Sequence, residues 1–236
     1  MSPIWTIAKR ELNAYFVSPI AYVYLITFLV FVHWFFFRGF FLEGQTSLRS
    51  LFQLVPWVFL FLVPATAMGK WSEEKKTGTI ELLFTFPLKD IQVVLGKFLA
   101  GLSLVGLALF LTFPLPLTVS LLGTLDFGPI IGGYLGLLLL GGSYLAIGLW
   151  VSALTENQII AFIVGLLCCF ALFMIGEPLF TTGLPPILVA ILQNASLSAH
   201  FQSIGRGIID SRDILYYFSV IFFFLFLNLK VVEKRT

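Results

Sequence analysis

The sequence predicts an all-α integral membrane protein with six transmembrane helices, and three observations lead to this fold class. Hydrophobic residues make up 59% of the 236 residues and charged residues only 11%, whereas soluble domains carry about 25% charged residues. Several apolar runs reach the length of about 20 residues with which a helix crosses a bilayer. The net charge of +2 is small and the basic residues are dispersed, which excludes a nucleic-acid-binding surface. The lipid bilayer is therefore the expected solvent and partner.

The chain opens with residues 1–19, which we expect to form an interfacial helix. Ser2 and Pro3 suit the N-cap and the first helical position. Apolar residues between Ile4 and Phe16 fall on one helical face, as in helices that lie along a membrane surface. The apolar run that follows is too long for a signal peptide and lacks a small-residue cleavage site. We interpret it as an uncleaved first span.

Six apolar runs are candidate spans, and they leave almost no chain for a soluble domain. The third run is longer than one span, and we expect Pro114 and Pro116 to kink or end it because proline removes a backbone donor. We therefore treat residues 1–236 as a single transmembrane domain. The six runs are Ile20–Phe41, Leu51–Met68, Ile91–Leu122, Ile130–Leu154, Gln158–Gly176 and Ile214–Val231.

The distribution of positive charge predicts that both termini are cytoplasmic. With the N-terminus inside, ten of the 14 Lys and Arg residues belong to inside segments and four to outside segments. This asymmetry follows the positive-inside rule. The longest outside segment then precedes the last span.

The densest polar stretch, residues 71–90, lies between the second and third spans on the predicted cytoplasmic side. Ser72 can cap a turn opened by Glu73, because a carboxylate is favourable at the positive end of a helix. We expect Gly78 to interrupt that turn and Thr79 to start a second one, which Pro87 would end. The residues alone leave two interpretations open, a solvated loop and a docking site for a soluble partner.

Residues 73–83, EEKKTGTIELL, are followed by Pro87 and by IQVVLGKF at 91–98. This pattern resembles the E-x-x-x-G-T-x-E-L-L…P…LGK signature of ABC-2 type exporter permeases. The resemblance covers nearly the whole chain and implies an ABC-2, type V exporter-like architecture. In that family this stretch is the coupling helix, which sits in a cleft of the nucleotide-binding subunit. The resemblance thus implies the ATPase-coupling residues Glu73, Glu74, Gly78, Thr79, Glu81 and Pro87.

A finer likeness is to permease subunits associated with gliding motility in Bacteroidetes-type bacteria. The residues that carry it are Gln53–Trp57, Thr155–Phe162 and His200–Asp213. Similar permeases are associated with copper-enzyme maturation and with antibiotic export. The resemblance therefore implies an architecture rather than a particular cargo.

The resemblance implies a transport subunit of the bacterial inner membrane, half of a translocation path driven by a separate ABC ATPase dimer. No Gly-x-x-x-x-Gly-Lys-Ser/Thr motif occurs, so we expect ATP to be bound by that partner and this chain to hold no cofactor or metal. A second permease subunit, identical or different, would complete the path. Two alternatives remain open. One is an intramembrane enzyme, which needs a facing nucleophile and base, and the other is a non-transporting membrane scaffold.

The external segment, residues 178–213, contains an apolar stretch at 187–192 that is too short to span a membrane. By resemblance, this segment is a re-entrant hairpin in the outer leaflet. Its charged residues form either an ion-paired latch or an ordinary solvated loop. If the segment is helical, Arg206 and Asp210 share one face at i, i+4 spacing. The candidate latch residues are His200, Arg206, Asp210, Arg212 and Asp213.

Two features inside the predicted spans also have structural or functional interpretations. His33 lies within the first span, where an ionisable residue is a functional candidate. We expect it either to make an interhelical hydrogen bond or to contact a substrate. Gly132 and Gly136 form a G-x-x-x-G pattern that permits close helix packing within one subunit.

Overall fold

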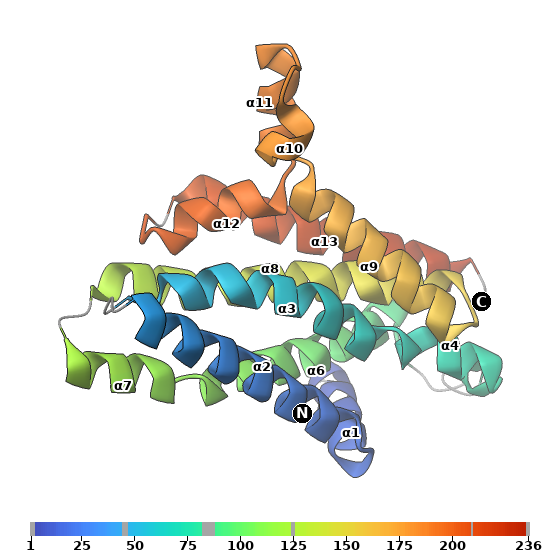
Figure 1. Cartoon of the computed structure of the whole chain (residues 1–236). Helices are drawn as coiled ribbons and strands as arrows, with labels where there is room; N and C mark the ends of the chain where they lie inside the picture. Colours follow the sequence, from blue (N-terminus) through green and yellow to red (C-terminus); the bar gives the residue numbers. More distant parts are fainter. Residues whose placement is uncertain (1–2, 44–46, 82–87, 124–125, 209, 235–236) are drawn as a thin grey trace.

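Long, roughly parallel helices pack around one central helix, α8 (Phe127–Leu154), in this computed structural model (Figure 1). Helices α3 (Arg49–Ala67), α6 (Asp90–Leu111) and α13 (Ser211–Glu233) all contact α8. Within the described part of the chain the only regular secondary structure is helical, which confirms the predicted fold class. The structure describes residues 3–43, 47–81, 88–123, 126–208 and 210–234.

Five helical stretches among the described residues are long and apolar enough to cross a membrane. The sixth predicted span corresponds to α9 (Gln158–Met174), which is apolar but has only 17 residues. It ends early because the chain turns at Gly176, where an added Cβ would lie 2.5 Å from the Ser196 side chain. The five longer stretches are Ile20–Phe40 within α2 (Ile20–Glu43), Arg49–Lys76, Asp90–Leu122, Phe127–Leu154 and Ser211–Glu233.

The predicted break at the paired prolines is confirmed. Helix α6 ends at Leu111, and α7 (Pro114–Leu122) begins at the first proline. The N–H groups of Thr112 and Phe113 donate to carbonyl oxygens three residues earlier, each at 3.0 Å, which tightens the end of α6. Because Pro114 has no N–H, the α-helical ladder cannot continue through it.

Small residues allow the neighbours of α8 to approach its backbone closely. An added Cβ at Gly132 would lie 2.4 Å from the carbonyl oxygen of Ile204 in α12 (Leu197–Gly205). An added Cβ at Gly136 would meet the Phe201 ring at 3.2 Å. The expectation that this G-x-x-x-G pattern serves packing within one subunit is therefore confirmed.

The N-terminal helix α1 (Pro3–Val17) lies against α6 and also contacts α2. The buried residues of α1 include Ile7, whose side chain occupies the space where Gly96 lacks a Cβ. Trp5, expected on the apolar face, is 56% exposed. The packed face is thus rotated from the predicted one. Ser2, the predicted N-cap of this helix, lies outside the described residues. That α1 lies along the membrane surface stays a prediction.

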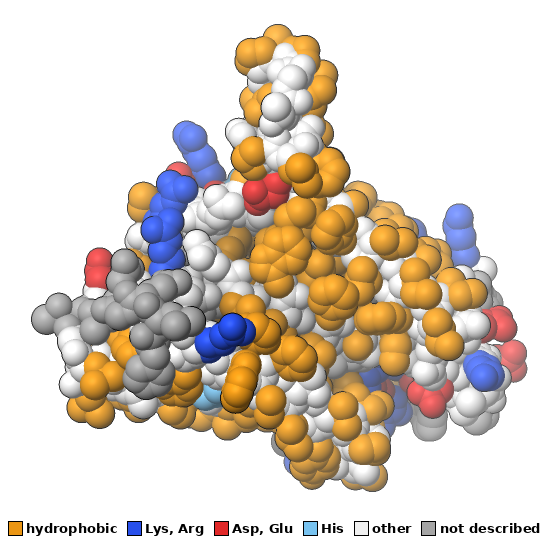
Figure 2. Space-filling view, viewed as in Figure 1, with side chains coloured by type: hydrophobic (Ala, Val, Ile, Leu, Met, Phe, Trp, Pro, Cys, Tyr) orange, Lys and Arg blue, Asp and Glu red, His pale blue; other side chains and the backbone are white. Residues whose placement is uncertain are grey.

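After α9 the chain forms an arm of two short helices, α10 (Pro178–Thr181) and α11 (Pro186–Asn194), that projects from the body (Figure 1). No residue of α11 is buried, and hydrophobic side chains cover much of the arm (Figure 2). Helix α12 then returns along α8. The predicted re-entrant segment is therefore helical, while its depth in the bilayer stays a prediction.

We expect Gly132→Ala to destabilise the protein, because its Cβ would overlap the Ile204 carbonyl oxygen and force α8 and α12 apart. Overpacking of this kind costs about 1–3 kcal/mol. Thermal unfolding in detergent should show a lower midpoint for this variant. The control is Gly106→Ala, whose nearest neighbour would be 3.8 Å away. Equal midpoints for Gly132→Ala and the wild type would contradict the close contact.

Candidate functional site

The predicted coupling segment begins with α4 (Gly69–Lys76), which continues from α3 after Met68. The N–H groups of Trp71 and Ser72 donate to the hydroxyl oxygen of Ser152 in α8, at 3.1 and 3.2 Å. The Ser152 hydroxyl in turn donates to the carbonyl oxygen of Met68. The start of α4 is thereby fixed to the central helix. The expectation that Ser72 caps a turn is wrong, because Ser72 lies inside α4 and its hydroxyl donates to Met68.

A cluster of charged side chains lies between α1, α4 and α6. Nζ of Lys97 is 2.5 Å from Oε1 of Glu74 and 3.5 Å from Oε1 of Glu11. Nζ of Lys70 is 3.2 Å from Oε2 of Glu11. The Lys97 side chain is 0% exposed and that of Glu11 9% exposed. We call Glu11, Lys70, Glu74 and Lys97 the ionic cluster.

Aromatic rings and backbone oxygens complete the surroundings of the two lysines. Lys97 donates to the carbonyl oxygen of Lys70 at 3.0 Å and lies 4.8 Å from the centroid of the Trp71 ring. Lys70 lies 3.5 Å from the centroid of the Tyr15 ring. Rings below a desolvated ammonium add cation–π attraction. Each lysine is therefore held by a carboxylate and a ring together.

The electrostatics of the ionic cluster favour the ionised form of Glu11. Burial raises the pKa of this carboxyl, but the ammonium groups of Lys97 and Lys70 outweigh burial and lower the pKa to about 2. Removing one member of a buried ion pair costs about 3–5 kcal/mol, since it leaves an uncompensated charge. The ionic cluster therefore holds α1, α4 and α6 together as one unit.

The predicted coupling residues divide into an inward and an outward group. Glu74 points into the ionic cluster, whereas Glu73, Gly78, Thr79 and Glu81 are exposed. Pro87 lies outside the described residues. We call the exposed group the α4 edge; it consists of Glu73, Lys76, Thr77, Gly78, Thr79 and Glu81.

A tight turn shapes the α4 edge. Gly78 has a φ of 70°, in the left-handed region that glycine adopts without steric cost, and it follows the end of α4. The Thr77 hydroxyl donates to the carbonyl oxygen of Glu73 at 2.9 Å, and that of Thr79 donates to the carbonyl oxygen of Glu74 at 3.3 Å. The predicted interruption at Gly78 is thus confirmed.

At the opposite end of the body, two of the five predicted latch residues meet. Nδ1 of His200 in α12 lies 2.6 Å from Oδ1 of Asp213 in α13, and Nε2 lies 3.1 Å from the carbonyl oxygen of Asn194. The His200 ring stacks on Tyr216 with centroids 3.9 Å apart. This outer pair joins the end of the arm to α12 and α13.

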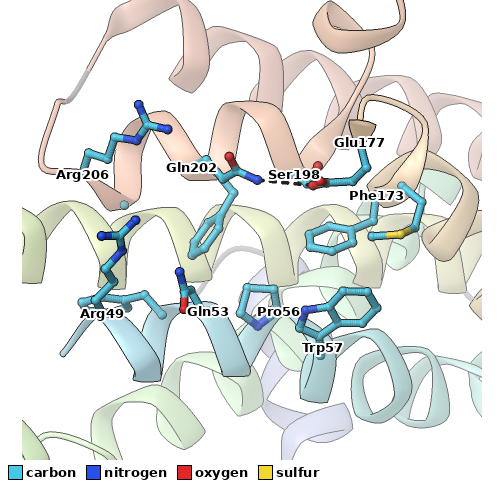
Figure 3. A pocket seen from close by; sticks show the side chains of 13 residues that line it. Arg49, Gln53, Pro56, Trp57, Phe173, Glu177, Ser198, Gln202 and Arg206 are labelled. Atoms are coloured by element: carbon cyan, nitrogen blue, oxygen red, sulfur yellow. Dashed lines mark hydrogen bonds between the residues drawn. The ribbon is translucent and has the colours of Figure 1, made fainter. Parts of the chain in front are cut away.

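The predicted pairing of Arg206 and Asp210 on one helical face is wrong. Helix α12 ends at Gly205, and Asp210 is the N-cap of α13, where its Oδ1 accepts from the Arg212 N–H at 2.9 Å. Gly207, with a φ of 85°, reverses the chain between them. The Arg206 side chain instead lines a groove together with Arg49 (Figure 3).

The predicted interhelical hydrogen bond of His33 is also wrong. Its Nδ1 lies 2.9 Å from the carbonyl oxygen of Leu29, one turn earlier in α2. The ring is half-buried and lies beside Phe37. In the described parts of the chain, no three His, Cys, Asp or Glu side chains gather closely enough to hold a metal ion.

Sequence reasoning missed Glu11, Lys70 and Lys97 as members of one cluster. A signal for Glu11 was present, because this acid falls between Ala8 and Tyr15 on the packed face of an otherwise amphipathic helix. Such an acid must find a cationic partner when the face is buried. Lys97 was part of the resemblance but had no structural role assigned.

Comparison with known proteins matches most of the chain to one family. A family model described as ABC-2 family transporter protein matches residues 5–203. The match includes the ionic cluster, the α4 edge and His200, and it ends before α13. No curated protein matches the chain.

We expect acid to weaken the fold through Glu11. Its carboxyl has a pKa of about 2 in the folded protein, against an ordinary pKa of 4.5 for glutamate. The stabilisation is therefore complete above about pH 4.5 and is lost as the pH falls toward 2, with a loss of about 3 kcal/mol. Thermal unfolding in detergent across this pH range measures the loss.

The same unfolding series is measured on the variant Glu11→Gln. This variant should be less stable than the wild type at pH 7, and its stability should fall less between pH 4.5 and 2. Glu156→Gln removes an exposed acid between α8 and α9 and serves as the control, with the wild-type pH dependence expected. If Glu11→Gln loses as much stability between pH 4.5 and 2 as the wild type, Glu11 does not carry the acid sensitivity.

Proposed function

Because the chain belongs to the ABC-2 family of transporter proteins, we propose that it is the permease subunit of an ATP-driven exporter. It forms half of a translocation path, and a separate ATPase subunit, which binds the ATP, docks on the α4 edge. The chain is a multi-pass membrane component of a transporter, as its family and its apolar helices indicate. The direction of transport and the ATPase partner belong to the proposal.

The observation that carries this proposal is the anchoring of an exposed polar edge on a buried ionic cluster. A docking surface transmits motion only if it does not yield under load. The α4 edge meets this requirement because Glu74 pairs with Lys97 of α6 and the start of α4 is bonded to Ser152 of α8. The exposed carboxylates of Glu73 and Glu81 offer charge complementarity to a soluble partner.

The packing of α8 supports a path shared with a second permease subunit. Every residue of α8 from Leu139 to Leu149 is buried. The interior of this body is therefore a packed core. By contrast, large apolar side chains are exposed on α2, α9 and α13. A path between two such subunits, identical or different, leaves each core intact.

We also propose that the end carrying the α4 edge faces the cytoplasm of a bacterial cell, at the inner membrane. The α4 edge, the link between α8 and α9 and the end of α13 lie at the same end of the body (Figure 1). Most lysines of the chain belong to segments at this end, which the positive-inside rule assigns to the cytoplasm. A role in gliding motility rests only on the sequence likeness, because the family match is to ABC-2 transporters in general.

The geometry favours transport over an intramembrane enzyme. Ser143 in α8 donates its hydroxyl to the carbonyl oxygen of Leu139, and His33 in α2 contacts that of Leu29. Each group is thus directed at its own helix. An enzyme of the serine type needs the two to face each other.

We expect Glu81→Lys to weaken docking of the ATPase while the chain remains folded in the membrane, because the change reverses an exposed charge at the proposed contact. Affinity purification of the tagged chain from its native cells, with the ATPase identified by its P-loop, measures docking. Recovery of the ATPase should fall about tenfold, which corresponds to about 1.4 kcal/mol.

The matched control for docking is Glu233→Lys, the same charge reversal near the end of α13. This variant should retain the ATPase. Full recovery of the ATPase with Glu81→Lys, together with unchanged transport, would refute docking on the α4 edge.

The orientation has its own test by cysteine labelling. In a chain whose Cys168 and Cys169 are replaced by alanine, Ser211→Cys should react with a membrane-impermeant maleimide added to spheroplasts. Lys76→Cys should react only after the membrane is opened. Both positions are exposed. The chain is expressed without the ATPase in this test, so that Lys76 is not covered and access depends on the side of the membrane. Labelling of Lys76→Cys in intact spheroplasts would reverse the proposed orientation.

A further inference from the structure

Two arginines from different helices lie beside one groove at the end of the body opposite α4. Arg49 begins α3 and Arg206 follows the end of α12. The groove, formed by α3, α9 and α12, has a volume of about 480 Å³ (Figure 3). This volume is within the range of small-molecule sites, about 300–1,000 Å³.

The two cationic side chains of this groove lie at one end and two of its aromatic rings at the other. Figure 3 shows Arg49 and Arg206 at one end, Gln53 between, and Trp57 and Phe173 at the other end. The rings of Trp57 and Phe173 meet edge to face, with centroids 5.4 Å apart. Trp57 is 43% exposed, so one part of its ring is available for a further contact. A charged end and an aromatic end suit a ligand that is itself amphipathic.

The charged end is positive. Neither Arg49 nor Arg206 makes an ion pair with any described residue, and both side chains are exposed. Glu177 belongs to the other end of the groove, where it accepts from Gln202 at 3.3 Å. Asp126 lines a second groove that also contains both arginines, and its Oδ1 accepts from the N–H of Gly128. Among the side chains that the structure describes, two guanidinium groups and one carboxylate therefore line this end.

The two arginines are held on rigid supports. Helices α3 and α12 both pack on α8. The carbonyl oxygen of Ile204, just before Arg206, lies so close to Gly132 that an added Cβ would be 2.4 Å from it. The N–H of Arg49 donates to the Ser47 hydroxyl at 3.2 Å. The groove is thus already formed in the chain alone, which limits the entropy lost when a ligand binds.

We propose that this groove binds an anionic phospholipid from the bilayer. The phosphate lies between the guanidinium groups of Arg49 and Arg206, which bind phosphate oxygens through paired N–H donors. An acyl chain packs on Trp57 and Phe173. A phospholipid matches both ends, because its charge and its apolar chain are separated along one molecule. This site requires neither the proposed ATPase nor a particular orientation, since both leaflets of a bilayer supply phospholipid.

The test measures lipid binding to the purified chain in a neutral detergent by native mass spectrometry. Dioleoylphosphatidylglycerol should bind at least about tenfold more tightly than dioleoylphosphatidylcholine, a difference of about 1.4 kcal/mol. Glycerol phosphate, which has the charge without the chains, should bind far more weakly than either. Equal affinity for the two lipids would overturn the proposal.

Two double variants locate the site. Arg49→Gln with Arg206→Gln should abolish the preference for phosphatidylglycerol. The matched control, Arg38→Gln with Arg212→Gln, removes the same charge from exposed arginines outside the groove and should keep the preference. An equal loss in both would assign the preference to net charge and overturn the site.

Two further measurements distinguish a specific groove from general effects. Trp57→Ala should weaken binding of both lipids, because the acyl chain loses its ring contact. Thermal unfolding of every variant shows whether it is folded. If the double arginine variant is unfolded, the lipid preference of the wild type and the effect of Trp57→Ala decide whether the groove binds the lipid. Unchanged lipid affinity in Trp57→Ala would contradict the position of the acyl chain.

Discussion

Burial of the Lys97 ammonium group is the constraint on which the end of the protein that carries α4 depends. An ammonium removed from water is unfavourable by several kcal/mol unless carboxylates and other acceptors surround it. Its carboxylate partners come from two other helices, Glu11 from α1 and Glu74 from α4. Glu11 also pairs with Lys70, which is 59 residues away in the sequence. The position of α1 and the direction of α4 are therefore both set by one buried charge. The exposed α4 edge is rigid because it is continuous with the helix that this ionic cluster holds in place.

Helix α8 extends this rigidity to the opposite end of the body. Its Ser152 end holds the start of α4, and its Gly132 end is in close contact with the backbone of α12. Small residues along α8 allow both contacts, because a side chain at Gly132 would separate the helices. Helix α8 thus contacts both α4 and α12, the helix that contains His200 and ends just before Arg206. The α4 end and the end with His200 and Arg206 are thus connected through packed helices rather than through loops.

The sequence was sufficient for features that depend on local chemistry. The apolar runs predict the long helices, Pro114 predicts the break after Leu111, and Gly78 predicts the end of α4. It was insufficient where contacts depend on tertiary structure. The ionic cluster requires knowledge of which helices are neighbours, and the predicted pairing of Arg206 with Asp210 fails because Gly207 reverses the chain between them. Helical spacing is informative only within one helix.

The signature residues between 73 and 98 are therefore of two kinds. Glu74 pairs with the buried ammonium group of Lys97, whereas Glu73 and Glu81 are exposed. Adjacent glutamates differ in this way because successive residues on a helix point about 100° apart. A substitution at Glu74 removes a partner of a buried ammonium and acts on the fold. A substitution at Glu73 alters only an exposed charge, so under the proposed docking the same motif serves stability and coupling through different side chains.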